Sequence, residues 1–165
     1  MKKDTELYIR NITFGVTDSL VSTVGLLAGI DISGTTNHIV IMTGIIYAFV
    51  EAFSMAVGSF LSEESTEEYV AKGEVSSSKA FASGIIMFVS FIIASFIPIL
   101  PYIIFSPITA FWFSILFSII ALFIVGIIGG KISKVNAMKH AMQMALLGSL
   151  AIIIGVLVGK FVKSS

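Results

Sequence analysis

Apolar residues fill five long runs along the chain, and a short polar segment separates each run from the next. The runs cover residues 12–30, 39–62, 80–104, 108–130 and 140–159. About 20 predominantly apolar residues are needed to cross the hydrocarbon core of a bilayer, and a segment in lipid must satisfy its own backbone hydrogen bonds. The pattern therefore predicts an all-α integral membrane protein, in which residues 1–165 form a single transmembrane domain of five helices.

Residue types that favour helix starts stand at four of the breaks: Thr36 and Asn37, the stretch SSSK, Ser106-Pro107, and Asn136. Two prolines, Pro98 and Pro101, stand near the end of the third run. Because proline removes a backbone donor and clashes with the preceding turn, we expect the third helix to bend or end there.

The composition supports a bilayer as the solvent. Of the 165 residues, 56% are hydrophobic and only 12% are charged, and the mean hydropathy is +1.03. A soluble domain of this length could not bury that much apolar surface. The formal net charge is zero and the chain has no cysteine. The sequence thus gives no sign of a nucleic-acid partner, and it excludes disulfides, thiolate metal sites and cysteine nucleophiles.

The distribution of basic residues predicts the orientation in the membrane, because lysine and arginine concentrate in cytoplasmic loops. With the N-terminus in the cytoplasm and the C-terminus outside, eight basic residues lie inside: Lys2, Lys3, Arg10, Lys72, Lys79, Lys131, Lys134 and Lys139. Only Lys160 and Lys163 lie outside. We expect this orientation, in the cell membrane of a microbe.

Two acidic residues, Asp18 and Glu51, fall well inside predicted spans. A charge at the centre of a bilayer costs at least about 2.5–3.5 kcal/mol, so it persists only with partners or along a water-filled path. One interpretation is a protonated carboxyl that hydrogen-bonds to a neighbouring helix, and the other is an ion or proton site. We favour the ion site, because ionisable residues within the membrane are functional by default.

Met55 lies one turn from Glu51 on the same face of the second span. Counted from the ends of the apolar runs, Asp18 and Met55 stand at about the same depth, roughly 10 Å from the cytoplasmic side. Carboxylate oxygens with a thioether suit Fe²⁺ or Mn²⁺ better than Mg²⁺ or Ca²⁺. A methionine in an apolar helix is more often packing material than a ligand, so its spacing alone does not assign it a role.

Small or polar residues form a stripe on each of the first two spans. The first stripe holds Asp18, Ser22, Gly25 and Gly29, and the second holds Tyr47, Glu51, Met55, Gly58 and Ser62. We expect the two stripes to face each other. Glycine pairs at four-residue spacing also predict close helix packing, and they are Gly25/Gly29, Gly126/Gly130 and Gly155/Gly159.

The polar segment after the second run, residues 63–79, holds half of the acidic residues in the chain. Glu64, Glu67 and Glu68 share one face of an expected helical extension into the cytoplasm. This segment is either a solvated amphipathic stub or a mouth that concentrates cations below the membrane site. His38 and His140 have no partner at ligand spacing, so we interpret both as interfacial residues.

Several stretches of the chain resemble the vacuolar iron transporter family. "RNITFGVTDSLVSTVGLLAGI" (10–30) is similar to its first-helix signature, and "EAFSMAVGSFLSEES" (51–65) to its second-helix signature. "FIPILPYI" (96–103) and "ALLGSLAIIIGVLVGKFV" (145–162) are also similar to the family. The resemblance implies a five-helix homodimer with an ion path along the subunit interface, lined by the first helices. It also implies proton-coupled export of Fe²⁺, often with Mn²⁺, with Asp18 and Met55 matching the family's membrane ligands.

The chain departs from the family pattern at several positions. The family glutamate two turns before the methionine is Tyr47 here, and a glutamate stands one turn later as Glu51. The acidic position seven residues before the aspartate is Asn11, and the glycine after the aspartate is Ser19. Most of the cytoplasmic metal-binding domain is absent, and only the acidic segment 63–79 remains in its place. The identity of the metal and the retention of transport are therefore open.

The leading hypothesis is a dimeric transporter that moves Fe²⁺ or Mn²⁺ out of the cytoplasm in exchange for protons, with no permanently bound cofactor and no enzymatic activity. The expected metal-binding residues are Asp18, Glu51, Met55, Glu64, Glu67 and Glu68. The main alternative is a non-transporting scaffold or partner subunit of the same fold. A di-metal enzyme ranks last, since the sequence lacks carboxylates and histidines at paired helical spacing. Transport of a proton or Na⁺ through Glu51 alone is a further alternative.

Overall fold

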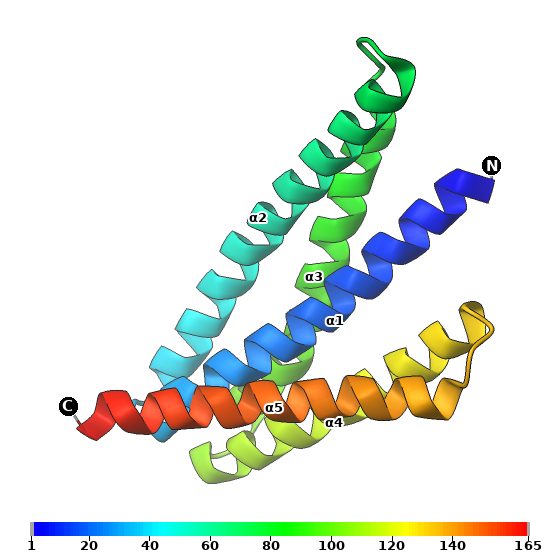
Figure 1. Ribbon diagram of the computed structural model, residues 1–165. Coiled ribbons are helices and arrows are strands. Elements are labelled where there is room, and N and C mark those ends of the chain that lie inside the picture. Colours follow the sequence, from blue (N-terminus) through cyan, green and yellow to red (C-terminus); the bar gives the residue numbers. More distant parts are fainter. Residues whose placement is uncertain (1, 165) are drawn as a thin grey trace.

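The chain is a bundle of five long helices joined by short loops (Figure 1). The computed structural model describes residues 2–164, with side chains from Thr5 onward. The side chains of Lys2 and Lys3 lie outside the described residues. The helices are α1 (Lys2–Ile32), α2 (Asn37–Ala71), α3 (Ser78–Ile104), α4 (Pro107–Ile132) and α5 (Ala137–Ser164). Each is long and apolar enough to cross a membrane, which confirms the expected integral membrane fold.

Two helices extend well beyond the apolar runs that predicted them. α1 begins at Lys2 rather than near residue 12. α2 continues to Ala71, which confirms the helical extension expected beyond residue 62. No glycine or proline interrupts either extension, so the helices continue outside the hydrophobic segment. α2 ends where Lys72 adopts a left-handed conformation, with φ of 55°. Most of the segment 63–79 is therefore helical.

The predicted helix boundaries are otherwise close. α3 runs through Pro98 and Pro101 and ends at Ile104. Asn136 caps α5, since its Oδ1 accepts the Lys139 backbone N–H at 3.0 Å. Thr36 and Ser106 occupy the N-cap positions of α2 and α4, although neither side chain makes a capping hydrogen bond.

The helices alternate in direction, so the loops gather at two ends of the bundle (Figure 1). One end carries the start of α1, the α2–α3 loop and the α4–α5 loop, and we call it the lysine-rich end. Its basic residues with described side chains are Arg10, Lys72, Lys79, Lys131, Lys134 and Lys139. The opposite end carries the other two loops and the end of α5, with Lys160 and Lys163.

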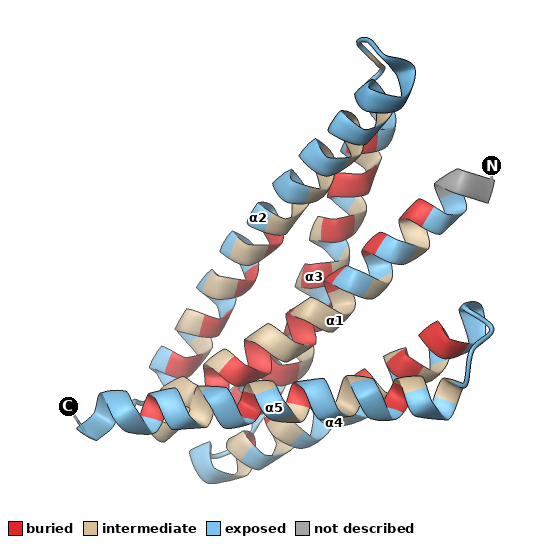
Figure 2. Cartoon of the chain, viewed as in Figure 1, coloured by how far each residue is buried: buried red, intermediate tan, exposed pale blue. Residues whose placement is uncertain are grey.

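Exposed positions cover much of the outside of the bundle, and buried positions lie where helices face one another (Figure 2). Many of the exposed positions hold large apolar side chains, while many buried ones are small or polar. The exposed ones include Phe53, Ile93, Trp112, Leu146 and Phe161. The buried polar ones are Asn11, Ser19, Thr23, Ser83, Ser95, Ser114 and Ser118. This is the distribution expected of helices that face lipid outward and pack through small and hydrogen-bonding residues inward.

Side-chain hydrogen bonds join α1 to α3 at three heights along the bundle. Asn11 donates to Ser83 near the lysine-rich end, and Ser19 donates to the carbonyl oxygen of Phe91 at 2.8 Å in the middle. At the opposite end Tyr102 donates to Asp31 at 3.2 Å. The partners are 72, 72 and 71 residues apart in sequence, so α1 and α3 run parallel with a nearly constant register.

Glycines join α1 to α5 and α4 to α5. Gly25 and Gly29 pack against the backbone of Ala151 and Gly155, and Gly159 packs against Gly29. Gly126 and Gly130 pack against the backbone of Ala141 and Ala137. All three predicted glycine pairs are therefore close packing faces, as small residues at this spacing allow.

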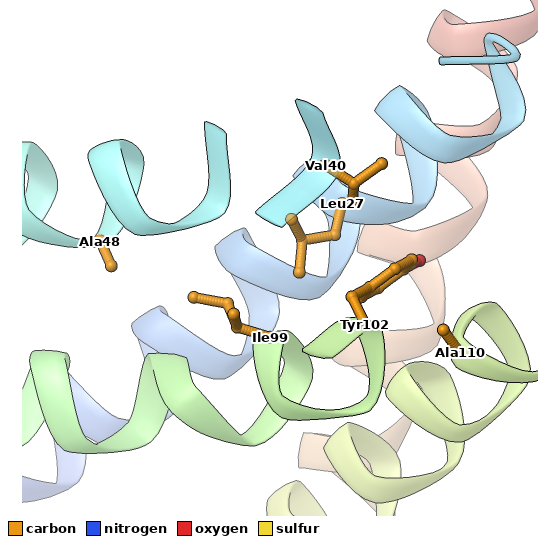
Figure 3. Packing of buried hydrophobic residues seen from close by; sticks show 6 residues of the cluster. All are labelled: Leu27, Val40, Ala48, Ile99, Tyr102 and Ala110. Atoms are coloured by element: carbon orange, nitrogen blue, oxygen red, sulfur yellow. The ribbon is translucent and has the colours of Figure 1, made fainter. Parts of the chain in front are cut away.

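A buried apolar cluster fills the space between α1, α2, α3 and α4 toward the opposite end of the bundle (Figure 3). Its members are Leu27, Val40, Ala48, Ile99, Tyr102 and Ala110. Asn37 donates to the carbonyl oxygen of Tyr102 at 2.9 Å, which ties the start of α2 to the end of α3. The cluster closes this end of the gap between the first three helices.

Candidate metal-binding site

Three polar side chains form a hydrogen-bonded layer between α1, α2 and α3 near the lysine-rich end. Asn11 Nδ2 donates to Ser83 Oγ, and the hydroxyls of Ser83 and Ser59 are 2.8 Å apart. Asn11 and Ser83 are buried. We call this set the Asn11 layer. It fixes which residues of the three helices stand at the same height near this end, and the deeper Ser19–Phe91 bond keeps the same register between α1 and α3.

The two intramembrane carboxylates lie on neighbouring helices. Asp18 of α1 and Glu51 of α2 are close enough to interact electrostatically, and both side chains are half-buried. Tyr47 of α2 hydrogen-bonds with Ser22, and the Ser22 hydroxyl donates to the backbone carbonyl of Asp18 at 2.7 Å. The structure thus brings Asp18 and Glu51 together, with the phenol of Tyr47 beside them.

The two small-residue stripes face each other only in part. Asp18 and Ser22 lie toward α2, where they meet Glu51 and Tyr47. Gly25 and Gly29 continue the same stripe but pack against α5. The reason is that α1 lies between α2 and α5, so successive parts of one stripe meet different neighbours.

A cleft of about 650 Å³ lies on the lysine-rich side of the two carboxylates, although neither Asp18 nor Glu51 lines it. It is lined by Arg10, Asn11, Phe14, Ser54, Met55, Gly58, Ser59, Ser62 and Met87. These residues come from α1, α2 and α3. The cleft therefore offers hydroxyl, amide and thioether donors along a route toward Asp18 and Glu51.

The position of Met55 differs from the expected one by about a turn. Counting back one turn along α2 from Ser59 of the Asn11 layer reaches Met55, and one turn along α1 from Asn11 reaches Gly15. Met55 is therefore level with Gly15, and Glu51 stands nearest the level of Asp18. The expected depths were measured from the ends of the apolar runs, whereas side-chain packing sets the real register.

The acidic residues of the α2 extension are largely engaged by their own chain. Glu64 accepts a hydrogen bond from Ser77 at 2.6 Å, Glu67 pairs with Lys79 at 3.2 Å, and Glu63 pairs with Arg10 at 3.6 Å. Glu68 is exposed. Among the described side chains of residues 5–164, no group of three or more histidine, aspartate or glutamate side chains is placed to hold a metal ion. A role for Glu64, Glu67 and Glu68 in metal capture stays a prediction.

Sequence reasoning missed several residues around the site. Asn11 stood out only as a departure from the family, yet it anchors the layer that sets the register. Met87 is one of seven methionines, and nothing in its local sequence separates it from packing residues. His140 is half-buried, lies against Gly129 and lines a second cleft that also includes Glu6. Met87 stands one turn from Ser83 on α3, so it is placed beside the cleft only once the contact between Ser83 and Asn11 is known.

The arrangement suits a cation that reaches the carboxylates from the lysine-rich end. Two carboxylates can neutralise a divalent ion that has left water, and a thioether ligand favours transition metals over Mg²⁺ and Ca²⁺. Arg10, which lines the cleft, pairs with Glu63 at 3.6 Å, so Glu63 offsets the positive charge of the guanidinium. The opposite end is closed by the apolar cluster.

Comparison with known proteins adds a family. The model of the VIT family matches residues 9–79 and 71–160 of the chain, so the matched segments cover nearly the whole sequence. Among curated proteins, no match was found.

Proposed function

Because the chain belongs to the VIT family, whose members carry metal ions across membranes, we propose that it moves a divalent transition metal, Fe²⁺ or Mn²⁺, out of the cytoplasm in exchange for protons. The observation that carries the proposal is the pairing of Asp18 with Glu51 inside the membrane-spanning helices. Such a pair is costly without a cation or protons to neutralise it. We take the cell membrane of a microbe as its location and the lysine-rich end as its cytoplasmic side.

The mechanism we propose uses the open cleft as the entry path. An ion enters from the lysine-rich end past Ser62 and Ser59 and reaches Met55, Asp18 and Glu51. Binding requires deprotonated carboxylates, so the arriving metal displaces protons. One site then couples the two ions, because protons from the other side displace the metal in turn. Release requires the apolar cluster around Leu27 and Tyr102 to part.

We further propose that two copies of the chain pair through α1. Phe14 is 52% exposed, and a groove of about 480 Å³ runs between α1 and α5 beyond it, lined by small and apolar residues such as Ser22, Leu26 and Ala151. Small residues allow close approach of helices in lipid. Pairing along this face would place the half-buried Asp18 of each copy beside the interface.

The decisive experiment is metal flux into vesicles that contain the purified protein and carry an imposed pH gradient. We expect Asp18→Asn to abolish Fe²⁺ and Mn²⁺ flux and Glu51→Gln to lower it by about tenfold or more. Glu74→Gln, which removes an exposed carboxylate of the α2–α3 loop, is the control and should leave flux unchanged. Unchanged flux in Asp18→Asn would overturn the site.

A non-transporting scaffold is the second candidate, and one contact favours it. Tyr47 occupies the position of a family glutamate, and its hydroxyl is held by Ser22, so that position supplies no carboxylate. Thermal unfolding separates the two candidates. A transporter is stabilised by Fe²⁺ or Mn²⁺, because a ligand that binds only the folded state raises its stability, whereas a scaffold shows the same melting temperature with and without either metal.

A further inference from the structure

Two methionines from different helices line the same cleft. Met55 belongs to α2 and Met87 to α3, and both contribute to the wall of the cleft of about 650 Å³. Met87 is buried, with only 3% of its surface exposed, and Met55 is half-buried. A packing role would explain a single buried methionine. Two methionines on one polar cleft can act on the same ion only if they lie at the same height along the bundle.

The register places both thioethers at one height. In the Asn11 layer, Asn11, Ser59 and Ser83 are joined by hydrogen bonds. One turn deeper along each helix stand Gly15, Met55 and Met87, since four residues are about one turn and α2 runs opposite to α1 and α3. We call this second set the thioether layer. Its members share a height because hydrogen bonds align the three helices in the Asn11 layer, one turn nearer the lysine-rich end.

An independent contact supports that assignment. The Met87 sulfur lies so close to Gly15 that a Cβ on this glycine would be 3.1 Å from it. The side chain of Met87 therefore extends from α3 toward α1 at the level of Gly15. Because Gly15 has no side chain, the Met87 sulfur packs directly against α1, on the wall of the cleft that Met87 shares with Met55.

The thioether layer stands between two sets of oxygen donors. The hydroxyls of Ser59 and Ser62 line the cleft on the side of its mouth, and Asp18 and Glu51 lie about one turn deeper, roughly 5 Å along the helix axis. Methionine and glutamate side chains are long enough to reach a single ion placed between these levels. An ion moving inward meets sulfur before, or together with, the carboxylates.

We propose that Met87 is a second sulfur ligand, and that Met55 and Met87 together hold the transported metal in the thioether layer. This rests on the proposed function, and it narrows the class of substrate. Thioethers favour the later and softer transition metals, while Mg²⁺ and Ca²⁺ require oxygen ligands. Two sulfur ligands therefore favour Fe²⁺ over Mn²⁺, in addition to excluding Mg²⁺ and Ca²⁺.

The test compares Fe²⁺ with Mn²⁺ rather than measuring one metal alone. The full-length protein in detergent is titrated with each ion under anaerobic conditions, and the apparent affinity is taken from the rise in melting temperature. Met87→Leu conserves volume and should weaken Fe²⁺ binding by about tenfold while changing Mn²⁺ binding by less than about twofold. Met42→Leu is the matched control, because Met42 is 46% exposed and outside the cleft.

A structural role for Met87 predicts a different pattern, in which both metals weaken by the same factor. A second measurement on the unaltered protein covers the case in which Met87→Leu fails to fold. The X-ray absorption spectrum of the Fe²⁺-loaded protein should show two sulfur neighbours around iron, and one or none overturns the proposal.

The outcomes also separate this proposal from the function on which it rests. If neither metal raises the melting temperature of the unaltered protein, the proposed function fails and this inference fails with it. If Fe²⁺ binds and Asp18→Asn abolishes binding, but Met87→Leu keeps the original ratio of Fe²⁺ to Mn²⁺ affinity, the site stands and only the role of Met87 is overturned.

Discussion

Gly155 of α5 lies directly against the carbonyl oxygen of Gly25 in α1, with no room between the two helices for a side-chain carbon. Backbone meets backbone at this point, so neither helix can move a flexible side chain aside. The same relationship recurs one turn along, where Gly159 lies against the carbonyl of Gly29.

The first prediction follows from this contact. Gly155→Ala should force α1 and α5 apart and lower the free energy of unfolding by about 3 kcal/mol, the upper end of the usual cost of overpacking. Gly58→Ala is the matched control, because a Cβ at Gly58 meets no atom within 4 Å, and alanine is the better helix former by about 1 kcal/mol. Thermal unfolding in detergent measures both variants. Equal stability of the two would show that α1 and α5 do not meet at Gly155.

The second prediction concerns the middle member of the Asn11 layer. Ser83 is hydrogen-bonded to both Asn11 and Ser59, so Ser83→Ala removes two hydrogen bonds and leaves the buried Asn11 amide without this acceptor. We expect a loss of about 1–2 kcal/mol. Ser59→Ala removes a single bond at the half-buried edge of the layer and should cost about half as much. If Ser59→Ala proved the more damaging in unfolding experiments, Ser83 would not be the centre of the layer.

A third prediction tests pairing through α1. The chain has no cysteine, so a single introduced cysteine reports on one position without background. Leu26→Cys lies in the groove between α1 and α5 and should form a disulfide-linked dimer in oxidised membranes. Ile124→Cys, which is 50% exposed on α4, should stay monomeric on the same gel. The reverse pattern would move the interface to α4.

The fourth prediction concerns the acidic face of the α2 extension. If Glu64, Glu67 and Glu68 concentrate cations near the cleft, replacing all three by glutamine should raise the apparent KM of transport by about two- to tenfold at low ionic strength, with kcat unchanged. The difference should shrink in about 0.5 M salt, where screening shortens the range of the charges. The single variant Glu74→Gln should show little change. A lowered kcat would instead mean that these residues act in the transport step.

The five helices could be predicted from the sequence because lipid imposes one strong rule, that a spanning segment must be long, apolar and helical. The helix extensions could not be bounded in the same way. Hydropathy ends near residue 62, but the backbone of α2 continues to Ala71, since a helix persists until a residue such as Lys72 with positive φ ends it.

The two carboxylates of the candidate site could be predicted from the sequence, but the relative depths of the site residues in the membrane could not. The cost of a charge in the membrane identified Asp18 and Glu51 without any tertiary information. The level of Met55 depended on the register between helices, which is set by contacts such as Asn11 with Ser83, residues that lie far apart in sequence. Met87 was missed for the same reason, because only packing brings α3 alongside α2.

The contacts of α1 with its two main neighbours are of unlike kinds. Against α3 it is pinned by hydrogen bonds at Asn11, Ser19 and Asp31, so any sliding there must break specific bonds. Against α5 it presents glycine backbone to glycine backbone, flanked by apolar contacts of Val24 and Ala28 with Ile152. Helices that meet through such contacts can slide past each other by small amounts without breaking a specific hydrogen bond, as in shear motions. If the bundle changes shape to open its closed end, we expect α5 to slide along α1, while α4 stays with α1, α2 and α3 because Ser114 donates a hydrogen bond to the Pro98 carbonyl of α3.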